Sequence, residues 1–444
     1  MFDSKALTKV QSLALAAIII VAAAAGSAAY YLSSGPAQSA ENIRVGICGD
    51  LDQTAGKAVL QGATLAVEQI NAQGGILGRN ITIVAEDDDS ETPPGDVAVA
   101  TNALTKLITV DKADYVVASA ATSIGITYQD ICSEHKKILI TVNNALVNLT
   151  QRVSDNYDKY KYYFRAYQVN SSTVSNGMLG DVMAVANYTG FTKVALLFLD
   201  ITAYKPTYLG LNKSLSSHGL EVVYSNLFPV GTTDFTSYFA AAEAAGAEII
   251  VPLMGNPTSA PFVKEWYERQ SPTVLWGVMS GAVDGSFWKI TEGKCDTVSF
   301  AGTPAVSGYS LTNKTALTKE AYIQRWGEIP SAAAIGTYDT LRFILPDAIE
   351  RGGTTETEAV IKALEATNVE TSLARHFVFT TNHDIMVGTD SPNNPAEDYL
   401  VMMIFQWQDG KQVPVRPYEI MKEARVTYKF PPWSGPWGSR TEAP

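Results

Sequence analysis

Hydroxyl side chains follow one predicted strand in a pattern that suits the binding of a small anion. The apolar run at residues 115–118 leads into a loop that contains Thr122 and Ser123, and a helical pattern begins directly after them. Hydroxyl groups and free backbone N–H groups at the start of a helix can together hold a carboxylate. The same two residues also suit a plain helix N-cap. The spacing fits both interpretations equally well.

A second polar loop follows the next predicted strand. Asn143 and Asn144 come directly after the apolar run at residues 138–142. Their amides can both donate and accept hydrogen bonds, which suits a neutral polar ligand. Asparagine is also common in ordinary turns, so the pattern fits a purely structural role as well. Open α/β sheets bind ligands at the carboxyl ends of their strands. We therefore expect both loops to lie at one sheet edge and to form one candidate ligand site.

The sequence contains no recognisable catalytic apparatus. It has no G-x-S-x-G elbow, and the loop at residues 49–57 misses the spacing of a phosphate loop, with Ala58 where that motif needs Ser or Thr. The acids at residues 86–89 could hold a hard cation such as Ca²⁺, but such a run is more typical of a solvated turn. We therefore predict neither an enzyme nor a cofactor or metal. The four histidines also lack metal-ligand spacing: His135, His218, His376 and His383.

Composition and charge exclude several classes of protein. The chain has 444 residues, of which 46% are hydrophobic and 18% charged, as is typical of a globular protein. Its formal net charge is -12 and its pI is near 4.9, so it lacks the basic field that a nucleic-acid partner requires. Its three scattered cysteines form neither a disulfide framework nor a zinc motif.

Apolar runs alternate with helical patterns, which predicts an α/β fold. One series of buried parallel strands is expected at residues 43–47, 81–84, 115–118 and 138–142, and a second at 194–199, 221–224, 248–253 and 274–278. One helix per strand predicts a doubly wound sheet for each series. Helical patterns lie at residues 56–71, 236–245, 319–326, 338–351 and 357–367, before a strand-rich end at 377–379 and 399–406.

The first forty residues predict a membrane anchor. Lys5 and Lys9 precede an apolar run at residues 10–32. That run is roughly 23 residues, or about 34 Å as a helix, which is enough to cross a bilayer. We expect the segment to stay uncleaved, although residues 26–28 would suit a cleavage site. The lysines place the rest of the chain outside the cytoplasm, at the cell surface or in a periplasm-like space.

Six N-x-S/T sequons in the exported part predict a glycoprotein. Such acceptor sites are glycosylated at the surface of exported proteins. The acceptor residues are Asn80, Asn148, Asn170, Asn187, Asn212 and Asn313.

Several blocks of the chain resemble the type I periplasmic binding proteins of branched-chain amino-acid ABC transporters, the leucine/isoleucine/valine-binding group. The resemblance covers residues 43–418, and its most specific piece is the helix-to-Gly-Gly block at residues 62–79. The strand at 43–47 precedes that block. The other pieces are residues 86–90, 233–236, 338–339, 347–353 and 406–411.

The resemblance implies two Rossmann-like lobes, which are joined by three crossing strands and close on a ligand by a hinge. It places residues 43–164 plus 304–376 in the first lobe and residues 165–303 plus 377–424 in the second. Residues 1–40 then form a cytoplasmic stub, anchor and linker. Residues 425–444 form a tail rich in Pro, Trp and Gly.

The resemblance also implies ligand-binding residues in the first lobe. In the family, a Ser/Thr loop after the third strand and an Ala-Thr loop after the fourth hold the carboxylate and ammonium groups of the ligand. The first loop corresponds to Thr122 and Ser123. The second corresponds to Asn144, with Ala145 in place of the threonine, and Asn143 precedes it.

The second lobe keeps one family residue and departs at others. Its tyrosine is kept as Tyr204, whereas the acid that pairs with the ammonium is replaced by Met279 and a tyrosine by Asn256. A first-lobe tyrosine is likewise replaced by Ala55. A buried ammonium without a carboxylate partner is costly. The ligand is therefore expected either to lack an ammonium group or to meet another acid, for which Asp200 and Glu86 are candidates.

The sequence thus predicts a membrane-anchored, extracytoplasmic solute-binding protein. It would capture a small polar organic molecule, such as an amino acid or a related carboxylate or amide, and deliver it to an ABC transporter permease. The alternative from another class is a ligand-sensing ectodomain that partners a membrane signalling protein.

Overall fold

The computed structural model describes residues 41–90, 96–119, 124–201, 204–304, 306–307, 309–388, 395 and 397–434, without the side chain of Asn256. The predicted anchor, within residues 1–40, lies outside this part. Among the described helices, none combines the length and the hydropathy needed to cross a bilayer. The elements below belong to one unit, Ile43–Pro444.

The first sheet has five parallel strands in the order β2-β1-β3-β4-β5. The chain runs from β1 outward to β2 and then returns to β3 on the other side of β1. The switch point of a doubly wound sheet, where such folds bind ligands, therefore lies between β1 and β3. The four predicted strands are confirmed, and a fifth joins them: β1 Ile43–Gly49, β2 Ile81–Asp87, β3 Tyr115–Ser119, β4 Ile138–Thr141 and β5 Tyr163–Arg165.

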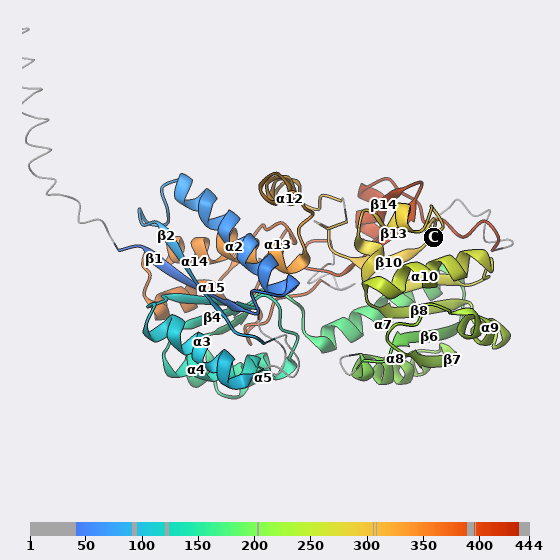
Figure 1. The fold of residues 1–444 in the computed structure, drawn as a ribbon, viewed down its shortest axis with the longest axis horizontal. Helices are drawn as coiled ribbons and strands as arrows, with labels where there is room; N and C mark the ends of the chain where they lie inside the picture. Colours follow the sequence, from blue (N-terminus) through green and yellow to red (C-terminus); the bar gives the residue numbers. More distant parts are fainter. Residues whose placement is uncertain are drawn as a thin grey trace, which may run out of the picture. The chain divides into compact units, whose positions relative to one another are not determined.

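Helices cover both faces of this sheet, as one helix per strand predicts (Figure 1). One face packs against α2 (Thr54–Ala72), α12 (Asn313–Trp326), α13 (Ala332–Asp339), α14 (Leu345–Gly352) and α15 (Thr357–Glu365). The other packs against α3 (Val97–Thr109), α4 (Gly125–Glu134), α5 (Val147–Asp155) and α6 (Tyr157–Tyr160). The helix predicted at 338–351 is therefore two helices, α13 and α14, joined by a π-helical turn at Thr340–Ile344.

The second sheet has seven strands in the order β14-β13-β10-β9-β8-β6-β7, with β13 antiparallel to both of its neighbours. Its predicted series of four strands is confirmed. An Asp409-Gly410 turn, with both residues at positive φ, joins the β13–β14 hairpin. The strands are β6 Lys193–Leu199, β7 Glu221–Phe228, β8 Ile249–Met254, β9 Val274–Met279, β10 Ser299–Gly302, β13 Met403–Gln408 and β14 Lys411–Arg416.

The second sheet is also covered on both faces (Figure 1). Helices α7 (Ser171–Thr189) and α8 (Lys205–Ser217) pack on one face, and α9 (Thr236–Ala244) and α10 (Asn256–Glu268) on the other. Helix α16 (Tyr418–Glu423) follows β14, and α11 (Phe287–Ile290) follows a short 3₁₀ turn. A two-stranded sheet of β11 (Asn368–Val369) and β12 (Phe377–Val378) lies between β10 and β13 in the sequence.

Part of the predicted tail packs on the second sheet. Tyr428 and Phe430 are buried, and the backbone carbonyls of Thr427 and Lys429 accept hydrogen bonds from Gln408 and Gln406 of β13. Aromatic side chains in this stretch therefore extend the core rather than forming a separate appendage.

Helices α2 and α13 approach each other closely at a glycine. A Cβ atom on Gly62 would lie 2.2 Å from the backbone oxygen of Ala334, so only glycine fits there. By contrast, no described atom lies within 4 Å of the corresponding position on Gly177 in the interior of α7. The two glycines thus differ in the space available to a side chain.

We expect Gly62→Ala to destabilise the protein by about 1–3 kcal/mol, because the added methyl group must push the two helices apart. The matched variant Gly177→Ala should instead stabilise it by up to about 1 kcal/mol, since alanine is the better helix former. Urea unfolding of both variants provides the measurement. Equal effects of the two substitutions would contradict the close packing of α2 on α13.

A buried carboxyl group connects the end of α13 to the segment before β12. Asp339 is 2% exposed, and its Oδ2 accepts a hydrogen bond from the backbone N–H of Ser372 (2.9 Å). Burial raises the pKa of Asp339 to about 7, although its hydrogen bonds with Ser372 and Thr371 act in the other direction. The folded protein therefore holds a proton that the unfolded chain releases near its ordinary pKa.

We expect Asp339→Asn to remove a pH-dependent part of the stability. Because the folded pKa is raised, this carboxyl's contribution is present at pH 4 and is lost as the pH rises toward 7, by about 1.4 kcal/mol per pH unit. The free energy of unfolding of the wild type, minus that of the variant, should fall between these pH values. A constant or rising difference in urea titrations would contradict this.

Candidate functional site

The structure joins the end of β3 to the polar loop that follows β4. Gly49 at the end of β1 pairs with Ser119 at the end of β3, so the switch point lies between them. The Asn143 Nδ2 donates to the Ser119 Oγ across a distance of 3.2 Å. This hydrogen bond joins the loop after β4 to the end of β3. Ser119 and Asn143 therefore lie at one edge of the sheet, and the same placement of Thr122 and Ser123 stays a prediction.

Asn144 has a structural role in its loop. Its side chain is 1% exposed, and its Oδ1 accepts a hydrogen bond from the backbone N–H of Leu146 (3.0 Å). This is the turn chemistry that asparagine often provides. Its backbone oxygen accepts a hydrogen bond from the Arg165 guanidinium. Contact between Asn144 and a ligand remains a prediction.

The hydroxyl residues Thr122 and Ser123 lie outside the described residues. The helix that follows, α4, begins at Gly125 with Ile124 at its N-cap position and no side-chain cap. A Cβ atom on Gly125 would lie 2.5 Å from the Asn144 Nδ2, so the start of α4 passes close to the loop after β4. The described surroundings thus place this helix start beside the second polar loop.

A buried ion pair holds the loop after β4 in place. Arg165, at the end of β5, is fully buried, and its Nε lies 2.9 Å from Oδ1 of Asp384. Its Nη2 donates to the backbone oxygen of Leu146 (2.7 Å). Asp384 also accepts hydrogen bonds from Asn170, the N-cap of α7, and from Thr150 of α5. One ion pair therefore connects the site loop with the start of α7.

Acidic side chains gather at the ends of β1 and β2. Carboxylate oxygens of Asp50, Asp87 and Asp89 lie within 4.8 Å of one another. Oxygen ligands of this kind suit Ca²⁺ or Mg²⁺. Asp50 is 1% exposed and directly follows β1, at the switch point. Asp50 is not among the residues predicted from the sequence, although its position directly after the first predicted strand was a usable signal.

The acidic run after β2 is only partly solvated, in contrast to the expected solvated turn. Asp88 is fully buried and accepts a hydrogen bond from the Tyr128 hydroxyl (2.5 Å), which lies 3.1 Å from the Cys48 Sγ. Burial raises the pKa of the Asp88 carboxyl above its ordinary value, against the effect of its hydrogen bonds with Ser90 and Tyr128. Asp88 therefore has a structural role, as a buried hydrogen-bond partner of Tyr128.

The two acids proposed as substitutes for the missing carboxylate already have cationic partners. Glu86 forms an ion pair with Lys106, and Asp200 with Lys205 (3.0 Å). Each would have to exchange its lysine for a ligand. Asp50 directly follows β1, one of the two strands that flank the switch point of the first sheet.

The predicted residues of the second lobe occupy different environments. Tyr204 is half-buried at the start of α8, and burial raises the pKa of its phenol. Met279 ends β9 and is fully buried in the hydrophobic cluster that also contains Met254 and Phe287. Asn256 is the first residue of α10, and its side chain lies outside the described part. A ligand contact for each of these residues remains a prediction.

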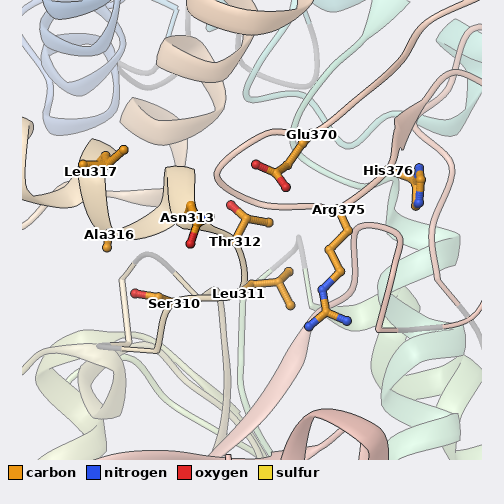
Figure 2. A pocket seen from close by; sticks show the side chains of 9 residues that line it. All are labelled: Ser310, Leu311, Thr312, Asn313, Ala316, Leu317, Glu370, Arg375 and His376. Atoms are coloured by element: carbon orange, nitrogen blue, oxygen red, sulfur yellow. The ribbon is translucent and has the colours of Figure 1, made fainter. Parts of the chain in front are cut away.

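A cavity of about 780 Å³ lies at the N-terminus of α12, away from these strand ends. Figure 2 shows Arg375 and His376 on one side of it and the start of α12 on the other. Arg375 forms a bidentate ion pair with Glu423, and the His376 Nδ1 lies 2.8 Å from the Asn368 Oδ1. Because these polar groups already have partners within the chain, we do not assign the ligand site to this cavity.

A model of the periplasmic binding protein family matches residues 43–411 of the chain. The chain belongs to the periplasmic binding protein family. The predicted family resemblance is thereby confirmed, and the two covered sheets are the fold that it implied.

Other members show how the resemblance extends over the chain. The Leu/Ile/Val-binding protein homolog 7 of Brucella abortus (strain 2308) is 24% identical over 403 residues, covering 87% of this chain and 94% of the relative. A structure named as a branched-chain amino acid ABC transporter from Silicibacter pomeroyi superposes with a TM-score of 0.74 at 20% identity, covering 88% of this chain and all of that one.

A third relative was solved with a ligand. The branched-chain amino acid transporter substrate binding protein LivJ of Streptococcus pneumoniae, in complex with isoleucine, superposes with a TM-score of 0.61 at 21% identity. It covers 84% of this chain and 99% of its own. At this identity the two structural matches show the fold. The relatives are binding and transport proteins by name, and this periplasmic binding protein is accordingly classed with substrate-binding proteins.

We expect Arg165→Met to lower the free energy of unfolding by about 3–5 kcal/mol, because it leaves Asp384 buried without its cation. The control is Arg325→Met, which breaks an exposed pair with Glu68 whose side chains are 44% and 47% exposed. That variant should lose no more than about 1 kcal/mol. Urea unfolding compares the two, and similar losses would show that the buried pair does not support the loop after β4.

Proposed function

We propose that this protein is an extracytoplasmic solute-binding protein that captures a small polar organic molecule and delivers it to an ABC transporter permease. The observation that carries the proposal is the set of polar groups at the switch point of the first sheet. Ser119, Asn143 and the N-terminal end of α4 come together there. Doubly wound sheets bind ligands at this place. The family match supports the same function.

The ligand class we favour is an amino acid or a related carboxylate or amide. The S. pneumoniae relative was solved with isoleucine. An amino acid bound here would need an acid for its ammonium group, and Met279 at the family position is fully buried in the core. An acid of the first lobe would then have to pair with the ammonium, and Asp50, which directly follows β1, is the candidate. A carboxylate or amide without an ammonium group has no such requirement.

The proposed function also assigns roles to the two lobes and to the N-terminal segment. Residues 43–164 plus 304–376 and residues 165–303 plus 377–424 would act as two lobes that close on the ligand about the three crossing segments. The N-terminal segment would anchor the protein to the cytoplasmic membrane, with the lobes outside the cytoplasm. Nothing in the described residues or in the relatives favours the alternative of a sensing ectodomain.

Glycosylation would be restricted to some of the six sequons. Asn80, Asn148, Asn187 and Asn313 are exposed and could accept a glycan. Asn170 is half-buried, and both ends of its amide are already engaged, because its Oδ1 caps α7 and its Nδ2 donates to Asp384 (3.0 Å). We therefore propose the four exposed residues as the acceptors if the protein is glycosylated in its host, which mass spectrometry of the native protein would test.

A thermal-shift screen of residues 41–444 tests the proposed function. The ligands are leucine, isoleucine and valine, their amides, and the matching carboxylates without the amino group. Binding to the native state at 100 times the Kd stabilises it by about 2.7 kcal/mol, which raises the melting temperature by several degrees. A shift with the amino acids indicates that another acid serves the ammonium, and a shift with carboxylates or amides alone indicates a changed specificity. No shift with any of these compounds would contradict the proposal.

We expect Thr122→Ala to weaken binding of the compound with the largest shift by about tenfold or more, the equivalent of one hydrogen bond to a charged group. The melting temperature of the ligand-free protein should change little, since the residue is predicted to face the ligand. The matched control is Thr101→Ala on α3, a half-exposed threonine whose hydroxyl donates to the backbone oxygen of Val97, and it should leave the affinity unchanged. Unchanged affinity in Thr122→Ala, with a lower melting temperature, would refute this placement.

A further inference from the structure

His383 is the buried histidine among the four of this chain. Its side chain is 1% exposed, whereas His135, His218 and His376 are exposed. It follows β12 and lies beside β5, the last strand in the order of the first sheet. There its backbone oxygen accepts a hydrogen bond from the backbone N–H of Arg165 (2.9 Å). His383 therefore covers part of a strand edge that would otherwise present unpaired backbone groups.

Both ring nitrogens of His383 face groups that accept hydrogen bonds. The Nδ1 atom lies 2.9 Å from the backbone oxygen of Tyr163, and the Nε2 atom lies 3.0 Å from the Glu365 Oε1. A carbonyl oxygen can only accept, so Nδ1 must carry a proton. An ionised carboxylate can also only accept, so Nε2 must carry one as well. A ring with two protonated nitrogens is the imidazolium cation.

The Glu365 carboxylate is set up to face a cation. Its side chain is 32% exposed, and its Oε1 also accepts a hydrogen bond from the Tyr157 hydroxyl (2.5 Å). Partial burial, together with the adjacent Glu365, raises the pKa of Tyr157, so this phenol stays protonated and remains a donor. Hydrogen bonds donated to a carboxylate favour its charged form. The negative charge of Glu365 then lies directly opposite the Nε2 atom of His383.

The other neighbours of the ring also suit a cation. The Phe164 ring stacks on it with a centroid distance of 4.0 Å and an interplanar angle of 5°. The face of an aromatic ring attracts positive charge. Arg165 and Asp384, the charged groups next to it on β5 and on its own segment, form an ion pair with each other (2.9 Å) and so leave its charge to Glu365. The titratable groups around the ring are thus Glu365 of α15, Tyr157 of α6, Tyr163 and Arg165 of β5, and Asp384.

The contacts of His383 also bear on the loop after β4. Two adjacent residues hold Arg165, because the His383 oxygen binds its backbone N–H and Asp384 binds its guanidinium. His383 has a φ of 60°, which residues other than glycine rarely adopt, so its contacts must keep it in place. A neutral ring would lose the hydrogen bond from Nε2 to Glu365. The segment that carries Asp384 would then be held less firmly.

We propose that His383 is held as an imidazolium between β5 and Glu365, and that loss of its proton loosens the anchoring of the loop after β4. His383 is thus a positioning residue that acts through Asp384 and Arg165. Because the folded protein favours the protonated ring, this contribution to stability is complete below about pH 6.5, the ordinary pKa of histidine, and is lost as the pH rises above it. The charge belongs to the ligand-free protein, so its test is independent of the proposed function.

NMR of the ligand-free full chain, labelled with ¹⁵N in its histidine rings, measures the charge of His383. The signals are identified in a variant that retains His383 as its single histidine and carries His135→Gln, His218→Gln and His376→Gln, all at exposed positions. We expect protons on both ring nitrogens of His383 at pH 7, above the ordinary pKa of about 6.5 at which half of the rings are neutral.

Two variants of α15 test the role of Glu365. In Glu365→Gln the carboxylate becomes an amide, so the ratio of doubly to singly protonated rings at pH 7 should fall about tenfold or more, the equivalent of one hydrogen bond to a charged group. The matched control is Glu358→Gln, which removes a carboxylate that is 64% exposed and pairs with Lys161. It should leave the ratio unchanged.

Hydrogen exchange tests the connection to the loop after β4. In ligand-free Glu365→Gln, the backbone N–H groups of Arg165 and Leu146 should exchange at least about threefold faster than in the wild type at the same pH, because the segment at His383 opens more often. Both N–H groups are hydrogen-bonded in this region, to His383 and to Asn144. Glu358→Gln should exchange like the wild type.

Three results would overturn the proposal. A singly protonated His383 ring in the wild type at pH 7 would reject its charge. An equal ratio of ring forms in the wild type and Glu365→Gln would reject Glu365 as the partner. Unchanged exchange of Arg165 in Glu365→Gln would reject the connection to the loop. If circular dichroism shows that Glu365→Gln disturbs the fold, the wild-type spectrum still decides the charge, and wild-type exchange at pH 6 and pH 8, corrected for the intrinsic rates, decides the connection.

Discussion

The buried ion pair between Arg165 and Asp384 is the constraint on which the candidate site depends. It joins the end of β5 to a segment more than 200 residues later in the chain. Through its hydrogen bonds it also holds the loop after β4, and through Asn170 the start of α7. Two buried charges are tolerated because each is surrounded by hydrogen-bonding partners. The Arg165–Asp384 pair therefore fixes the position of the polar loop after β4.

Close backbone packing positions the end of β1 and the start of α2, beside the polar groups at the end of β3. Gly49 lies beside the backbone of Ser119, and a Cβ atom on Gly56 would lie 2.0 Å from the backbone oxygen of Asp50. These contacts press the start of α2 against the end of β1. The end of β1 is thus held in close backbone contact with both the end of β3 and the start of α2.

The two sheets end in side chains of different chemistry. The first sheet ends in hydroxyl, amide and carboxyl groups, whereas the described candidates of the second lobe are a half-buried tyrosine and a buried methionine. Ligand selection by polar groups would therefore fall mainly on the first lobe. The second lobe has its own concentration of aromatic residues, on the face of its sheet where α7 and the chain's last described segment pack.

The sequence by itself determined the two series of four strands, some of the helices that alternate with them, and the family. Hydrophobic periodicity is a property of neighbouring residues, and the block at 62–79 is continuous. Only the tertiary structure decided the partners of the polar groups. Glu86 and Asp200 looked available but are paired with lysines, Met279 lies in the core, and Asp50 reaches the switch point. Burial and pairing depend on residues far apart in the chain, which local patterns do not encode.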